Sequence, residues 1–249
     1  MMNLEELSLN LIIVHRKTFI DGINLMNITN HMKELKKFTF NICSTIDIDN
    51  QIDLPSKETI EQTFKNFQFN QIICTVDYFH DISNGRCLIY TYPYRFEIYD
   101  NITNHFSGGL FQSVRQISLR DEQPFEHEFF LQIAQSFPLI KKLSLINYKP
   151  QMNKQYSYSS IIKYSNLKYL DLEEVHQDYI EQFLIDTKTC LPFCVDLIAN
   201  YELLDRVTYN FTRDQTRVNC SKVNFVYFDV PDSLPEHFNN YFFKTSGYE

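Results

Sequence analysis

A recurring apolar triplet, L-x-x-L-x-L, constrains the fold of this chain more than any other feature. Three clear copies and two looser ones stand in its second half, at Val114–Ile117–Leu119, Ile140–Leu143–Leu145, Leu167–Leu170–Leu172, Cys194–Leu197–Ala199 and Val223–Val226–Phe228. Their first positions are 26, 27, 27 and 29 residues apart. Two more copies and a degraded one stand earlier, at Leu4–Leu7–Leu9, Leu35–Phe38–Phe40 and Phe69–Ile72–Cys74. Spacing this regular indicates a structural unit that repeats along the chain.

The segments between the triplets carry apolar residues at helical spacing. Residues 124–138 and 176–188 each predict a helix, and Ser56 is expected to cap a helix over 60–67. Each unit therefore reads as a strand, a turn and a returning helix. One unit cannot fold alone, because ordering each residue costs about 1–2 kcal/mol, whereas each buried aliphatic side chain returns about 1.5–3 kcal/mol. Stacking the units would pair their strands into one parallel sheet.

The triplets, with IDGINLMNITNHMKELKKFTFNI and RDEQPFEHEFFLQIAQSFPLIKKLSLIN, resemble the repeat region of F-box leucine-rich-repeat proteins. The resemblance implies an α/β fold: a curved leucine-rich-repeat solenoid with parallel strands on its concave face and helices on its convex face. The solenoid is expected to span residues 1–230, with a C-terminal cap or tail over 231–249. The family's Asn ladder is missing, since only Cys43 matches its ladder position.

The same resemblance implies a non-catalytic protein-binding module, namely the substrate-recognition region of a ubiquitin-ligase receptor. An F-box has no counterpart in the sequence, so a cullin-ligase adaptor is an expected partner only if an F-box lies upstream. The first strand begins at Leu4 with nothing before it to cap the sheet, which predicts a fragment or a contact with another subunit. A free-standing inhibitor or scaffold of the ribonuclease-inhibitor type is the alternative.

Residues 70–112 break the period. Alternation over 72–77, then Asn84-Gly85, then CLIYTY, predicts a β-hairpin with its turn at Asn84-Gly85. This hairpin is expected to be an irregular insertion in the solenoid. It is either structural or a partner-binding device.

Side chains alternate along a strand, so the residues between the core positions of each triplet are expected on the concave face. We predict that a protein partner binds there. The predicted partner-binding residues are Gln116, Ser118, Arg120, Lys142, Ser144, Ile146, Tyr169, Asp171, Glu173, Asp196, Asn200, Tyr227 and Asp229.

The sequence carries no recognisable catalytic, cofactor-binding or metal-binding motif, so it predicts neither an enzyme nor a cofactor. A metal-dependent enzyme with a site near Asp77 and His80, with Asp81 beside them, is a remote alternative. Glu126-His127-Glu128 is expected to be a solvated helix face, because successive helical residues point in different directions. Cys194 is expected to pack in the core as a triplet position.

The formal charge of −8 argues against a nucleic-acid partner, which would need a basic surface. No apolar run is long enough to span a membrane, and the first residues do not resemble a secretory signal. These features predict a cytoplasmic or nuclear protein that does not bind membranes. The six cysteines are expected to be free, buried thiols.

Overall fold

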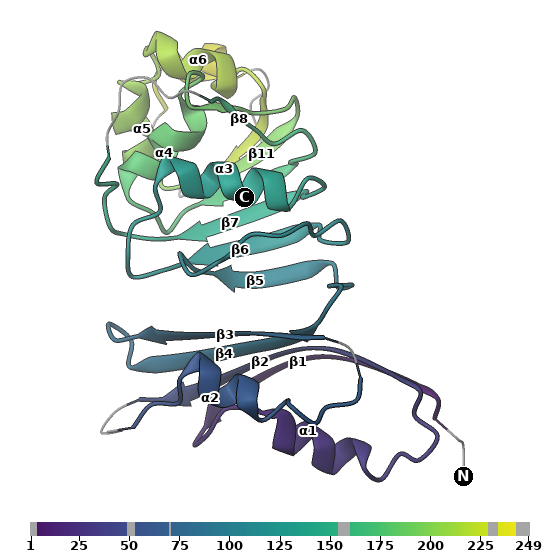
Figure 1. Ribbon diagram of the computed structural model, residues 1–249. Coiled ribbons are helices and arrows are strands. Elements are labelled where there is room, and N and C mark those ends of the chain that lie inside the picture. The colour runs from purple at the N-terminus through teal and green to yellow at the C-terminus, as the bar shows by residue number, and fades with distance from the viewer. Residues whose placement is uncertain (1–3, 49–52, 70, 154–159, 229–233, 243–249) are drawn as a thin grey trace. The chain divides into compact units, whose positions relative to one another are not determined.

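The computed structural model describes residues 4–48, 53–69, 71–153, 160–228 and 234–242. The chain divides into two compact units, an N-terminal unit (Met1–Phe96) and a C-terminal unit (Glu97–Glu249). Figure 1 labels the helices and strands of both units.

The described part of the N-terminal unit is a four-stranded mixed sheet with two helices on one face. Its elements are β1 (Glu6–Arg16), α1 (Gly22–Thr29), β2 (Lys37–Asp47), α2 (Lys57–Gln62), β3 (Ile72–Phe79) and β4 (Asn84–Thr91). The strand order is β1-β2-β4-β3, with β1 and β2 parallel and the other neighbours antiparallel.

Alternation along β2 builds the core of this unit. Phe38, Phe40 and Ile42 are at most 1% exposed and pack with Leu25 of α1 and Ile60 of α2. Both helices begin at polar caps, as expected where backbone N–H groups would otherwise be unsatisfied. Ser56 accepts the Thr59 N–H at 3.2 Å and caps α2 as predicted, but the helix ends at Gln62 and does not reach residue 67.

The described residues of the C-terminal unit contain a six-stranded sheet in which every neighbouring pair is parallel. The strand order is β12-β11-β9-β7-β6-β5. The strands are β5 (Ile98–Ile102), β6 (Gln116–Arg120), β7 (Lys142–Ile146), β9 (Tyr169–Leu172), β11 (Val195–Ala199) and β12 (Val223–Tyr227).

Helices cover one face of this sheet (Figure 1). They are α3 (His127–Ser136), α4 (Gln177–Leu184), α5 (Tyr201–Thr208), α6 (Asp214–Cys220) and α7 (Phe238–Tyr241), and β8 (Ile162–Lys163) and β10 (Thr189–Cys190) form a small parallel pair. Leu143, Leu170 and Leu197 are completely buried, as are Phe130 of α3 and Phe183 of α4. The core of the unit therefore lies between the sheet and the helices.

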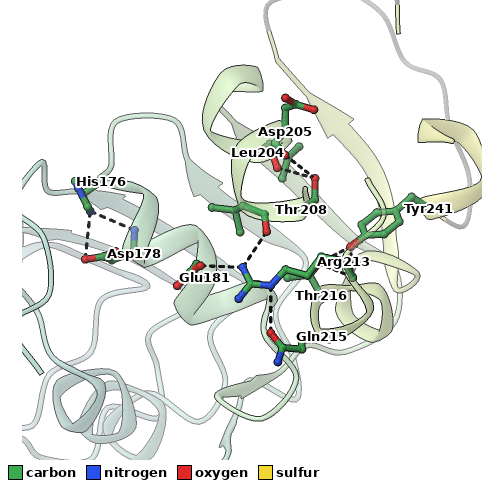
Figure 2. A network of polar contacts seen from close by, with 11 residues as sticks. His176, Asp178, Glu181, Leu204, Asp205, Thr208, Arg213, Gln215, Thr216 and Tyr241 are labelled. Atoms are coloured by element: carbon green, nitrogen blue, oxygen red, sulfur yellow. Dashed lines mark hydrogen bonds and ion pairs between the residues drawn. The ribbon is translucent and has the colours of Figure 1, made fainter. Parts of the chain in front are cut away.

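A polar network joins the helices near the end of this unit (Figure 2). Arg213 donates from Nη1 to Glu181 Oε1 at 2.8 Å and to the Val207 carbonyl at 2.9 Å. The Tyr241 hydroxyl of α7 donates to the Arg213 carbonyl at 2.5 Å and contacts the hydroxyl of Thr216. Burial raises the pKa of Tyr241 to about 12, so its hydroxyl remains protonated and able to donate near neutral pH.

The prediction of one leucine-rich-repeat solenoid with a hairpin insertion is wrong. The chain forms two compact units with separate sheets, and β3 and β4 are integral strands of the first sheet. The degraded triplet Phe69–Ile72–Cys74 leads into β3. This strand pairs antiparallel with β4, and β4 lies between it and β2. Apolar periodicity records which side chains are buried, but it does not record the direction in which two strands pair.

The predicted hairpin turn is also misplaced. The hairpin turns at residues 80–83, and Asn84 and Gly85 belong to β4. A Cβ on Gly85 would lie 2.8 Å from the Tyr78 ring and 3.0 Å from Ile46 Cγ1. This glycine is therefore needed for close packing within the sheet, and not for a turn. The boundary expected near residue 230 lies outside the described residues.

Candidate functional site: a polar sheet face

The candidate site is the face of the six-stranded sheet opposite its helices, here called the polar face. Strand register brings its residues into rows. The first row holds Gln116, Lys142, Tyr169, Asp196 and Phe225, and the second holds Ser118, Ser144, Asp171, Ile198 and Tyr227. Arg120 and Ile146 lie opposite each other in a third row. None of these side chains is buried, whereas the residues between them face the helices.

Ten of the predicted partner-binding residues lie on these strands. They are Gln116, Ser118, Arg120, Lys142, Ser144, Ile146, Tyr169, Asp171, Asp196 and Tyr227. Glu173 follows the end of β9, and Asn200 caps α5 by accepting the Leu203 N–H at 3.1 Å. Asp229 lies outside the described residues.

Charge is divided across the polar face. Arg120 and Lys142, on β6 and β7, form no ion pair with any residue that the structure describes. Asp171 and Asp196 lie on β9 and β11, where Asp196 accepts a hydrogen bond from Asn224 Nδ2 at 3.1 Å. The basic side chains therefore lie on β6 and β7, and the acidic half of the face is formed by β9 and β11. Asp100 of β5 adds one carboxylate beside Ser118.

Aromatic side chains accompany the acidic half. Tyr169 and Tyr227 are 49% and 39% exposed, and the rings of Phe225 and Tyr227 lie 6.3 Å apart. Beyond the end of β7, the Tyr148 hydroxyl donates to Glu174 Oε2 at 3.0 Å. Partial burial, that hydrogen bond and nearby carboxylates raise the pKa of Tyr148.

Sequence reasoning missed the contribution of β5 to this face. Ile98 extends the first row beside Gln116, and Ser118 Oγ donates to Asp100 Oδ1 at 3.1 Å. A register shift between Tyr99 and Ile102, with Asn101 at a φ of 52°, breaks the alternation that would have identified the strand. The buried Tyr99 and Ile102 are three residues apart, and this spacing does not signal a strand.

The structure separates the residues of the alternative metal site. Asp77 is 3% exposed and faces Arg86 across β3 and β4, whereas His80 is exposed in the turn between them. Within residues 4–48, 53–69, 71–153, 160–228 and 234–242, no three His, Cys, Asp or Glu side chains are placed to hold a metal ion.

Two smaller predictions are wrong. His127 is 3% exposed and does not belong to a solvated helix face, because its ring nitrogens lie 3.3 Å from Gln182 Oε1 and 3.0 Å from the Ser160 carbonyl. Cys194 is exposed, with a φ of 63°, and Val195 is buried beside it. The cysteines are free, as predicted, but they are not all buried. Among the residues that the structure describes, Cys74, Cys87 and Cys220 are buried, whereas Cys43 and Cys190 are half-buried.

Comparison with known proteins gives no relative for this site, since no protein-family model, curated protein or solved structure matches the chain. In the parts of the chain that the structure describes, no helix is both long and apolar enough to cross a bilayer.

Proposed function

We propose that the chain binds another protein through the polar face of the C-terminal unit, without catalysing a reaction. The observation that supports this is the exposure of one face of a fully parallel sheet. Parallel sheets normally have both faces covered, because their crossover connections place helices on each side. A partner that packs on the polar face would supply the second layer.

The chemistry of the face indicates what kind of protein surface would fit. A partner with carboxylates would complement Arg120 and Lys142, and one with lysine or arginine side chains would complement Asp171 and Asp196. Tyr169 and Tyr227 are the expected anchors, since partly exposed tyrosines bury a large area with few rotatable bonds.

The contexts that the sequence suggests would use this same surface. Recognition of a ubiquitin-ligase substrate and binding of a basic partner by a free-standing inhibitor or scaffold both stay predictions from the sequence, as does a cytoplasmic or nuclear location. Binding of a basic partner to the acidic half should weaken as salt rises, because exposed charges are screened.

The first test compares affinity capture by the wild-type chain and by face variants. Tyr169→Ala combined with Lys142→Glu is expected to reduce recovery of specific partners at least tenfold, since loss of one tyrosine anchor alone costs about 2 kcal/mol of binding. Recovery is measured by quantitative mass spectrometry against the unmodified chain.

Tyr209→Ala is the matched control. Tyr209 is 62% exposed but ends α5, on the helical side of the sheet, so its removal should leave the recovered proteins unchanged. The proposal fails if the face variant recovers the same proteins in the same amounts as the wild type and the control.

A further inference from the structure

The long edge strand β1 of the N-terminal unit lies outside the proposed binding face. It is eleven residues long, and in the described part of the chain it pairs with β2 alone. Its second half exposes apolar side chains: Leu11 is 40%, Ile12 69% and Val14 54% exposed. Exposed, apolar edge strands of this length readily pair with another strand, and most natural edges are short, charged or distorted for this reason.

The direction of the backbone groups in β1 follows from its pairing with β2. The Lys37 N–H donates to the Glu5 carbonyl at 3.1 Å, so the peptide groups of odd-numbered residues face β2. Because these groups alternate along a strand, the N–H and C=O of Ser8, Asn10 and Ile12 point away from β2. They form a row of donors and acceptors along the edge of the sheet.

The two ends of β1 carry opposite charges. Glu5 and Glu6 stand at its start, and Arg16 and Lys17 stand at its end. The glutamates also form exposed pairs with Lys36 and Lys37, at 3.0 and 2.8 Å, but pairs of this kind exchange easily in water. A second β1 in antiparallel orientation would place acidic ends against basic ends, whereas a parallel one would place like charges together.

We propose that two copies of this chain pair through β1, antiparallel, about a two-fold axis at Leu11. The four-stranded sheets of the two copies then join into one sheet of eight strands. Asn10 of each copy lies opposite Ile12 of the other, and the two exchange hydrogen bonds through their outward-facing peptide groups. The axis at Leu11 uses the regular part of the strand, before the register shift between Ile13 and Arg16 and the φ of 54° at His15.

The pairing also covers apolar surface. On the helical side of the sheet, Leu11 of one copy lies opposite Leu11 of the other. Leu9 of each copy lies opposite Ile13 of the other on the same side. These two residues already pack against the core of the unit, so the second copy extends that core sideways. On the other side of the sheet, the exposed side chain of Ile12 lies beside Asn10 of the partner copy.

Sedimentation velocity of the full chain tests the proposal. The wild type is expected to be a dimer, and Ile12→Pro is expected to weaken dimerisation at least tenfold. The proline removes an N–H that points away from β2, so the fold of the unit should persist, as a circular dichroism melt would verify. Ile12→Lys should act in the same direction, whereas Ile23→Lys, at an exposed site on α1, should leave the dimer intact.

A cross-link tests the register. Directly opposite residues of an antiparallel pair that do not exchange hydrogen bonds have Cα atoms about 4.5 Å apart, within reach of a disulfide. In a Cys194→Ser background, Leu11→Cys should therefore form an intermolecular disulfide with glutathione disulfide as oxidant, at least tenfold faster than Ile28→Cys on α1. The oxidant takes up two electrons and leaves as two glutathione thiols.

A wild-type chain that stays monomeric at about 100 µM overturns the proposal, because a specific dimer through β1 should have a dissociation constant below that concentration. A dimer that Ile12→Pro and Ile12→Lys leave unchanged overturns it as well, because that dimer must use another surface. Equal cross-linking at positions 11 and 28 rules out the axis at Leu11.

Discussion

Asp77→Ala is expected to lower the free energy of unfolding by about 3–5 kcal/mol, as measured by urea titration. Asp77 Oδ2 lies 3.8 Å from Arg86 Nη2, and both side chains are about 95% shielded from water, with 4% and 5% exposed. The two residues are direct cross-strand partners on β3 and β4. Removing the carboxylate leaves a buried guanidinium without the negative charge that faces it, and desolvation of a charge is costly.

A double variant separates this charge effect from a simple loss of packing. Asp77→Leu combined with Arg86→Met should be more stable than Asp77→Ala, because apolar residues of similar volume avoid the desolvation of both charges. Glu61→Ala is the matched control, since it removes a carboxylate from an exposed pair with Lys57 and should change stability by less than about 0.5 kcal/mol. A loss below about 1 kcal/mol for Asp77→Ala would contradict the assigned role of the pair.

Asn219→Ala should lower the free energy of unfolding by about 2–4 kcal/mol. Asn219 is completely buried on α6, and its Nδ2 donates to the carbonyls of Thr189 and Phe183 at 2.7 and 3.1 Å. Its Oδ1 accepts the Leu191 N–H at 3.1 Å. Alanine would leave several buried backbone groups unsatisfied at once, and each carries the desolvation cost of a lost partner.

Asn166→Ala provides the comparison for this substitution. Asn166 is exposed and donates a single hydrogen bond, from Nδ2 to the Pro138 carbonyl at 3.0 Å. Water can replace that bond, so the expected loss is less than about 1 kcal/mol. Chemical denaturation monitored by circular dichroism measures both variants, and similar losses at the two sites would show that burial of Asn219 does not set the cost.

The sequence was informative where burial alternates regularly. Leu143, Leu170 and Leu197 were expected to be neighbours in one sheet, and they lie in register on β7, β9 and β11. The same alternation indicated which residues of these strands face away from the helices. It failed at β5, where a register shift separates the buried Tyr99 and Ile102, and at Cys194, where the backbone has a positive φ.

The pairing of Asp77 with Arg86 could not be predicted from the residues alone. They are nine positions apart in the sequence, and a hairpin predicted to turn at Asn84-Gly85 cannot place Arg86 opposite Asp77. Once the turn lies at residues 80–83, the two face each other. The position of the turn sets the register of the two strands. An error of several residues in that position therefore changes every cross-strand neighbour.

The apolar spacing of this sequence determined by itself which side chains of most strands lie in the core. Successive side chains of an extended strand point to opposite faces, so apolar residues at every second position lie on the same face. Only the tertiary structure decided that the chain forms two units, that β2 pairs with β4 as well as β1, and that Asp77 is buried against a guanidinium. Those outcomes depend on contacts between residues far apart in the sequence. A local period does not encode which strands meet or in which direction they run.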